Sequence, residues 1–216
     1  MLHPELYTYN VDWIAWKKRF IRVETRSRDW DMIAREIPSD MNTPSDVWNW
    51  PLFTEEFCKM MIEEAEYFDA WTVDRHGFYA TNDMLLDVMG LDEMYEKVFR
   101  EFVYPCAAWI WKLDGDKWNQ FMKSENFIVR YQPSIQAHLN CHLDESNYSL
   151  TIGLNDEFEG GGTWFPRQKT LAKPDVGECT LFPMPTHKHA GMGITKGKRY
   201  IIVSFCRRGG REGGQS

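Results

Sequence analysis

The spacing of hydrophobic positions changes about halfway along the chain. Before residue 121 these positions recur mainly every three or four residues, which predicts amphipathic helices. After it they alternate in short segments divided by Gly, Pro and Asn, which predicts antiparallel strands. These segments read NFIVRYQP, SLTIGLN, ECTLFPM and RYIIVSFC. Helices followed by strands indicate an α+β domain, with N-terminal helices buttressing a jelly-roll core, or double-stranded β-helix.

The helical half is expected to contain three main segments. The first places hydrophobic side chains on one helical face, namely Trp13, Trp16, Phe20 and Ile21. In the second, Thr54 caps a helix whose first turn is acidic. The third begins near Asp92, and Pro105 should end or kink it.

These patterns divide the chain into three parts. Residues 1–45 form an N-terminal helical extension, expected to serve packing. Residues 46–206 form the main domain, with helical support over 46–120 and the jelly-roll core over 121–206. The tail, 207–216, reads RRGGREGGQS, has no apolar anchor, and is expected to be disordered.

Composition narrows the classes of function. The formal charge of −7 and pI of about 5.4 argue against a nucleic-acid partner and are compatible with a cationic substrate. No apolar run approaches the roughly 20 residues of a membrane span. The five cysteines are widely spaced and predict free, mostly buried thiols. Without a basic leader, the chain as given is expected in the cytoplasm, and in the endoplasmic reticulum only within a larger secretory-pathway protein.

One short motif points to a metal. His142 and Asp144 are two residues apart, so in an extended segment both side chains point the same way. A third ligand is available in THKH, where His187 and His189 are both candidates. Two histidines and one carboxylate on one face of an octahedron leave three open positions, as non-haem Fe(II) oxygenases require. An isolated HxD motif also arises by chance, and a lone histidine is more often structural.

Arg199 strengthens this interpretation. It follows His189 by ten residues, with three glycines between them, so a hairpin turning near Ile194 and Thr195 would place the two on neighbouring strands. On its strand, Arg199 shares a face with apolar side chains, where an unpaired charge is costly. We therefore expect an anionic partner, such as the far carboxylate of 2-oxoglutarate.

Several motifs in order resemble one family. From about residue 46 to 206, the chain is similar to the C-terminal catalytic domain of the procollagen lysyl hydroxylases, within the 2-oxoglutarate- and Fe(II)-dependent dioxygenase superfamily. The segments that carry the resemblance are SDVWNWPLFTEEFCKMMIEEAEYFDAW, NFIVRYQP, HLDESNYSLTIGLN, FEGGGTWF and THKHAGMGITKGKRYIIVSF.

The resemblance assigns roles to individual residues. It implies that His142, Asp144 and His189 are the metal ligands and that Arg199 holds 2-oxoglutarate. It favours His189 over His187, because the family ligand directly precedes an Ala-Gly or Glu-Gly pair and stands ten residues before the arginine. Tyr131 matches a tyrosine that related hydroxylases direct at the cosubstrate, although a core aromatic is an equally good interpretation.

The implied activity is hydroxylation of peptidyl lysine at carbon 5, in collagen-like Xaa-Lys-Gly sequences, with Fe(II), 2-oxoglutarate, O₂ and supporting ascorbate. A homodimer is also implied. Two alternatives remain. FEGGGTWF and HAG are similar to the prolyl 4-hydroxylases as well, although the collagen-type members commonly have lysine in place of Arg199. The chain could also be a non-catalytic jelly-roll binding module.

Overall fold

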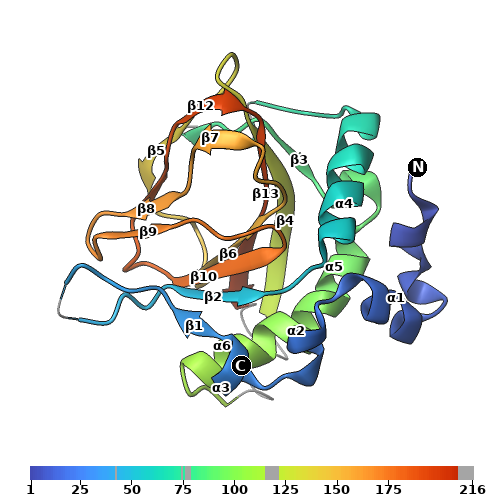
Figure 1. The fold of residues 1–216 in the computed structure, drawn as a ribbon, viewed down its shortest axis with the longest axis horizontal. Coiled ribbons are helices and arrows are strands. Elements are labelled where there is room, and N and C mark those ends of the chain that lie inside the picture. The colour runs from blue at the N-terminus through green and yellow to red at the C-terminus, as the bar shows by residue number, and fades with distance from the viewer. Residues whose placement is uncertain (42, 74, 76–78, 115–121, 209–216) are drawn as a thin grey trace, which may run out of the picture.

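Two facing β-sheets form the core of the molecule (Figure 1). The computed structural model describes residues 1–41, 43–73, 75, 79–114 and 122–208. The larger sheet has seven strands in the order β1 (Arg35–Glu36), β2 (Trp48–Pro51), β10 (Glu178–Pro183), β6 (Tyr148–Gly153), β13 (Arg199–Arg208), β4 (Met122–Tyr131) and β3 (Asp83–Leu85).

The opposing side is built from strands of three or four residues. Four of them form a sheet in the order β5 (Leu139–His142), β11 (His189–Gly191), β8 (Thr163–Phe165) and β9 (Thr170–Ala172). A separate pair joins β12 (Ile194–Gly197) to β7 (Phe158–Gly160). The pairings within these sheets are antiparallel, so the expected α+β jelly roll is confirmed.

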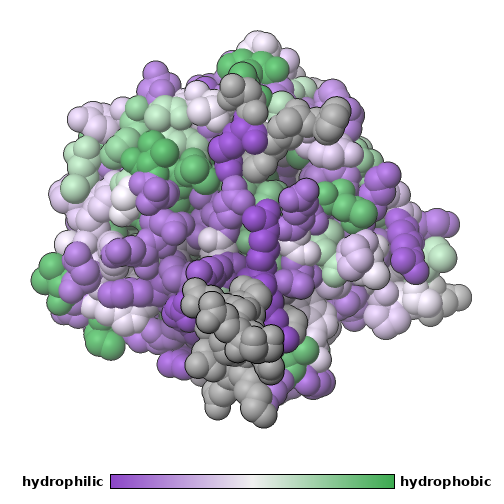
Figure 2. Space-filling view, turned by 180° about the vertical axis from the view of Figure 1, so that it is seen from behind, coloured by the Kyte–Doolittle hydropathy of each residue, from purple (hydrophilic) through white to green (hydrophobic). Residues whose placement is uncertain are grey.

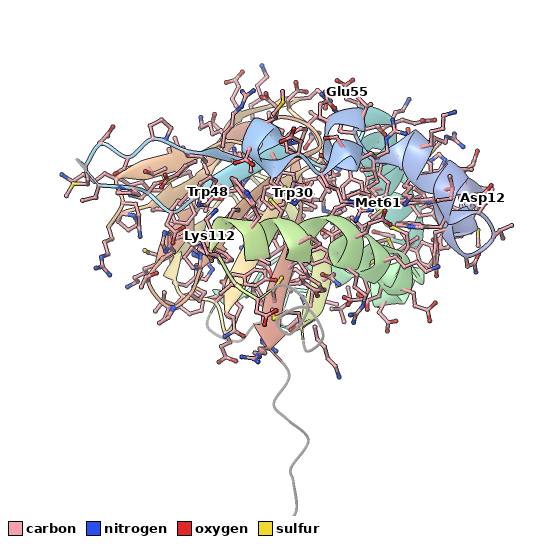
Figure 3. All side chains as sticks on the ribbon, turned by 90° about the horizontal axis from the view of Figure 1, so that it is seen from below. Asp12, Trp30, Trp48, Glu55, Met61 and Lys112 are labelled. Carbon is pink, nitrogen blue, oxygen red and sulfur yellow. The ribbon has the colours of Figure 1, made fainter. Side chains whose placement is uncertain are left out.

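Helices cover the outer face of the larger sheet (Figure 1). The N-terminal elements are a 3₁₀ helix (Pro4–Asn10), α1 (Trp13–Phe20), α2 (Val23–Ser27) and α3 (Trp30–Ile33). They are followed by α4 (Glu55–Phe68), a short 3₁₀ turn (Asp87–Met89), α5 (Asp92–Val98) and α6 (Tyr104–Ile110). In Figure 3, α1–α3 and the rod formed by α5 and α6 flank a layer of side chains that includes Trp30 and Met61, and both belong to the main core.

The strand alternation separates two cores. On β13, Tyr200, Ile202 and Cys206 pack into the main core with the helices. Ile201, one position along, belongs to a second cluster with Val129 on the inner face. Since successive strand residues point to opposite faces, the same pattern leaves Arg199 on the inner side, between the sheets.

The two predicted helices of the support region are confirmed. The Thr54 hydroxyl accepts a hydrogen bond from the Phe57 amide (3.3 Å) at the start of α4. Pro105 does not end the second helix. A wider π-helical segment, Phe99–Val103, precedes it, and Pro105 then occupies the first turn of α6, where its missing N–H is tolerated.

The predicted hairpin between His189 and Arg199 is wrong. β11 belongs to the smaller sheet and β13 to the larger one, and residues Ile194–Gly197 pair with β7 instead of forming a turn. Local glycine content could not reveal this, because β12 is stabilised by a segment more than thirty residues earlier in the chain. The two residues consequently face each other across the core.

Other expectations concern the ends and the thiols. β13 extends to Arg208, so the tail begins later than expected, and residues 209–216 lie outside the described part of the chain. All five cysteines are free, and four are buried, as predicted.

None of the described helices is long and apolar enough to cross a membrane. The face in Figure 2 is mostly hydrophilic, with hydrophobic atoms in separate small patches.

Candidate metal centre and pocket

His142 and Asp144 lie at the inner end of β5. His142 is the last residue of the strand, and Asp144 follows in the adjoining loop. Their side chains meet, with 3.1 Å between His142 Nε2 and Asp144 Oδ1. The predicted proximity of the HxD pair is therefore confirmed.

His189 completes the cluster from the neighbouring strand. It pairs directly with His142 in the register of β11 and β5, and its Nε2 lies 3.6 Å from Asp144 Oδ2. One ligand atom from each residue lies within 4.8 Å of the others. Among the described residues, this is the only group of three His, Cys, Asp or Glu side chains so arranged.

Both imidazoles are oriented by backbone carbonyls. His142 Nδ1 donates to the Asn140 carbonyl (2.7 Å), and His189 Nδ1 donates to the His187 carbonyl (3.0 Å). A carbonyl can only accept, so each Nδ1 carries a proton, and the Nε2 atom of each ring is the one that faces the cluster. Fixing the tautomer in this way is the usual arrangement around metal-binding histidines.

The protonation states suit a cation. Burial alone would raise the pKa of Asp144, but its contacts with His142, His189 and Ser149 together hold that pKa below its ordinary value. Burial lowers the pKa of His189, with Asp144 opposing the shift. An ionised carboxylate beside a neutral imidazole is what a metal ion requires of these ligands.

His187 is directed elsewhere. Its Nε2 hydrogen-bonds to the Ser45 carbonyl (2.8 Å), and its ring lies edge-on to Phe165. It is buried and fastens the loop before β2 to the smaller sheet. The structure thus brings His189, and not His187, to the cluster.

Arg199 lies at the start of β13, on the opposite wall from the cluster. The residue is only 3% exposed, and its guanidinium carbon is 5.4 Å from the centre of the Tyr131 ring. Burial lowers its pKa, and the nearby Tyr131 opposes the shift. Within the described chain, no carboxylate or hydrogen-bond acceptor pairs with this guanidinium. A buried cation without a counter-charge is costly, so the site is suited to an anion.

Tyr131 pairs with Arg199 in the register of β4 and β13 and is 3% exposed. Burial raises the pKa of its phenol, which therefore stays protonated. Its hydroxyl approaches Gly191 of β11, where a Cβ atom would lie 3.1 Å away. Tyr131 therefore reaches from the larger sheet almost to the strand that carries His189.

One cavity of about 430 Å³ joins these groups. It lies between the two sheets and is lined by all three cluster residues, by Tyr131 and by Arg199. Its apolar walls come mainly from β4 and β13, namely Phe127, Val129, Ile201, Val203 and Phe205. The sequence thus predicted the three cluster residues and the deep arginine of a single pocket.

Two residues of the site were not predicted from the sequence. Ser149 donates a hydrogen bond to Asp144 Oδ2 (2.5 Å), and Tyr79 lies against His142 with ring centres 5.0 Å apart. Ser149 has a weak signal, since it lies on the inward side of β6 between buried apolar residues. Tyr79 has none, because its segment follows neither a helical nor a strand period.

The fold and the site together define a class: a jelly-roll domain with a two-histidine, one-carboxylate cluster facing a pocket between its sheets. A family model described as the OGFOD2-like domain matches residues 1–115, more than half of the chain. The chain belongs to the OGFOD2-like family. The match runs across the boundary expected near residue 45.

Curated relatives confirm the resemblance to lysyl hydroxylases. The chain is 32% identical to the multifunctional procollagen lysine hydroxylase and glycosyltransferase LH3 of Rattus norvegicus, over 94% of this chain and 28% of that protein. It is 30% identical to procollagen-lysine,2-oxoglutarate 5-dioxygenase 2 of Mus musculus, over 89% of this chain and 27% of that protein. The chain therefore spans under a third of the relatives it matches.

Solved structures support the fold. A viral collagen prolyl hydroxylase from Paramecium bursaria Chlorella virus-1 has a TM-score of 0.55 at 17% identity, covering 85% of this chain and 99% of that one. A Pseudomonas putida prolyl-4-hydroxylase has a TM-score of 0.57 at 13% identity, covering 76% and 93%. At these identities the likeness concerns the fold alone.

Proposed function

We propose that this chain is a 2-oxoglutarate- and Fe(II)-dependent dioxygenase that hydroxylates peptidyl lysine in collagen-like sequences. The observation that carries the proposal is the pairing, in one pocket, of the His142–Asp144–His189 cluster with a buried Arg199 that has no counter-charge within the described chain. The names of the lysyl hydroxylase relatives support lysine as the target.

The residues present fit the metal. Two neutral imidazoles and one carboxylate are the ligand set of non-haem Fe(II) oxygenases, and their atoms are close enough to share one ion. When bound, Fe(II) supplies the oxidative chemistry, in which 2-oxoglutarate is decarboxylated to succinate and one atom of O₂ reaches the substrate. His142, Asp144 and His189 would hold the metal, and the pocket that they line would receive the substrates.

The opposite wall fits the cosubstrate. Arg199 can bind the far carboxylate of 2-oxoglutarate in a bidentate fork, which would supply the missing counter-charge. The protonated Tyr131 hydroxyl has no hydrogen-bond partner among the described residues and can donate to the same molecule. The apolar side chains of β4 and β13 line the cavity between Arg199 and the cluster.

The proposal has two further parts, which the family likeness supports. Ascorbate would sustain turnover, and the chain would form a homodimer. Exposed apolar side chains of the N-terminal region offer surface for self-association, namely Val11, Ile14, Val23 and Met32. Light scattering of the purified protein would measure the mass of the assembly.

Succinate formation tests the proposed class of enzyme. With Fe(II), 2-oxoglutarate, O₂ and a lysine-containing collagen-like peptide, the wild type should release succinate. Asp144→Ala should abolish that release and weaken Fe(II) binding, because it removes the carboxylate ligand. Asp156→Ala, which removes an exposed carboxylate outside the pocket, is the matched control and should retain activity.

Wild-type succinate yield from Asp144→Ala would refute the metal assignment. A wild type that turns over no 2-oxoglutarate under any of these conditions would instead favour a binding module. Hydroxylation of proline in place of lysine, located by mass spectrometry, would identify a prolyl hydroxylase on the same core.

A further inference from the structure

The pocket opens to solvent between four exposed side chains, which we call the pocket mouth: Tyr79, Leu143, Glu145 and Arg207. Tyr79 is 41% exposed and Leu143 is 45% exposed. Three of the four are linked to the His142–Asp144–His189 cluster by a ring contact or by the chain. Tyr79 lies against the His142 ring, and Leu143 and Glu145 are the chain neighbours of Asp144.

The cations near the mouth are already paired. Arg75 Nη1 lies 2.5 Å from Glu125 Oε1, and Arg75 Nε lies 2.7 Å from Asp83 Oδ1. Arg207 Nη2 lies 3.7 Å from Glu125 Oε2. Both arginines thus share Glu125, and neither contributes an unbalanced positive charge to the opening.

Three carboxylates line the pocket, and of these Glu145 is the one whose side chain is not paired within the described chain. Asp144 is occupied by the two histidines and Ser149, and Glu125 by the two arginines. The side chain of Glu145 makes no ion pair or hydrogen bond with the part of the chain that the structure describes. Its backbone carbonyl, in contrast, accepts a hydrogen bond from Arg207 Nε. The loop is therefore held at this residue while the carboxylate is left free at the opening.

We infer that Glu145 binds the side-chain ammonium of the substrate lysine and so selects lysine over uncharged residues. The inference rests on the proposed function. In hydroxylation at carbon 5, the ammonium nitrogen is two covalent bonds from the reacting carbon. A group that binds it must therefore lie close to the metal. Glu145 lines the same pocket as His142, Asp144 and His189, which is the placement that such a group needs.

The rest of the mouth suits the same side chain. The methylene groups of lysine can lie against Tyr79 and Leu143, while the ammonium reaches the carboxylate. A substrate that closes the mouth also removes Glu145 from water, which strengthens the ion pair. Proline or norleucine would instead leave the carboxylate desolvated without a partner, which is unfavourable.

Paired peptides test this inference. Two collagen-like peptides are identical except that one has lysine where the other has norleucine, which replaces the ammonium with a methyl group. Their affinities for the protein with Fe(II) and 2-oxoglutarate are measured without O₂, by tryptophan fluorescence. The wild type should bind the lysine peptide about five to ten times more tightly, as expected for one partly desolvated ion pair.

In Glu145→Gln the preference for lysine should disappear, because the lysine peptide binds more weakly and the norleucine peptide no longer desolvates an unpaired charge, whereas affinity for Fe(II) should stay unchanged. Glu145→Asp should retain part of the preference. Glu24→Gln, which removes an exposed carboxylate on α2, far from the pocket, is the control and should behave as the wild type.

Two results would overturn the inference: a wild type that does not distinguish the peptides, or a Glu145→Gln variant that still does. Both are read from binding and need no turnover. Failure of the proposed function shows separately, as the absence of Fe(II)-dependent succinate formation by the wild type. A wild type that forms succinate but binds both peptides equally would refute only the role of Glu145.

Discussion

Ser149 orients Asp144, one of the three candidate metal ligands, by a hydrogen bond. It is fully buried on β6, and its hydroxyl donates to Asp144 Oδ2 at 2.5 Å. Asp144 Oδ1 faces His142 Nε2, while Asp144 Oδ2 accepts the hydrogen bond from Ser149. Ser149 and the two backbone carbonyls behind the histidines together fix the orientation of all three cluster residues.

Ser149→Ala should therefore weaken Fe(II) binding about 10- to 100-fold, the usual effect of removing a hydrogen bond behind a metal ligand. The fold should persist, because the change removes a single hydroxyl. Fe(II) titration under anaerobic conditions measures the affinity. Ser146→Ala serves as the control, since Ser146 hydrogen-bonds to Ser149 but not to Asp144. Wild-type affinity in Ser149→Ala would contradict this role.

The glycine turn between β7 and β8 packs against the Arg199 side chain and leaves the space that this side chain occupies. Gly161 has a φ of +68°, and a Cβ atom there would lie 2.9 Å from the Phe158 ring and 3.1 Å from Arg199 Cδ. The position therefore requires glycine for its backbone conformation and also for the space that it leaves to the arginine.

Gly161→Ala should raise the KM for 2-oxoglutarate and lower stability by about 1–3 kcal/mol, because it strains the backbone and displaces Arg199. Steady-state kinetics and urea unfolding measure the two effects. Gly193→Ala is a matched control, since an added Cβ there meets no atom within 4 Å. Equal KM values for Gly161→Ala and Gly193→Ala would refute this role of Gly161.

A second element-scale contact joins α4 to two central strands. Glu66 of α4 accepts hydrogen bonds from Arg130 of β4 (2.8 Å) and from the Tyr200 hydroxyl of β13 (2.7 Å). Burial alone would raise the pKa of Glu66, but Tyr200, Arg130 and Lys198 together hold it below its ordinary value. A depressed carboxyl pKa stabilises the fold above the unfolded-state pKa.

That stabilisation should be lost as the pH falls from about 5 through the folded-state pKa of Glu66. In Glu66→Gln the free energy of unfolding should consequently depend less on pH across this range than in the wild type. Urea unfolding at a series of pH values measures the dependence. Glu55→Gln, at the exposed start of the same helix, should follow the wild type. An unchanged slope in Glu66→Gln would contradict the account.

Local sequence patterns predicted individual helices and strands better than they predicted which strands pair with each other. Alternation in RYIIVSFC places Arg199 and Ile201 on one face whatever strand lies beside them, so β13 and its buried arginine followed from the sequence. The pairing of β12 with β7 did not, because it joins segments far apart in the chain. For the same reason, Ser149 and Tyr79 were missed, since their roles exist only once distant elements meet.

On the scale of the whole molecule, the helices and the pocket lie on opposite faces of one sheet. Trp16 of α1 is 2% exposed, donates to the Leu6 carbonyl (3.1 Å) and packs against Phe57 of α4. The N-terminal region is thus part of the main core, although it contributes no residue to the pocket. Its contribution is to the stability of the sheet that carries Arg199.

Trp16→Ala should therefore lower the free energy of unfolding by about 3–5 kcal/mol, the cost of truncating a large buried aromatic side chain. Affinity of the folded protein for 2-oxoglutarate should not change. Ile14→Ala is the control, because Ile14 belongs to the same helix and is 67% exposed. A large loss of 2-oxoglutarate affinity with unchanged stability would show that the N-terminal helices shape the pocket directly.

We propose above that the His142–Asp144–His189 cluster and Arg199 support hydroxylation of peptidyl lysine. The most direct test of this proposal is turnover of a lysine-containing collagen-like peptide under isotopically labelled O₂, with mass spectrometry of the peptide and of succinate. We expect one labelled oxygen atom on carbon 5 of lysine, one labelled atom in an equal amount of succinate, and neither product from Asp144→Ala. An unmodified lysine, or the same products from Asp144→Ala, would contradict it.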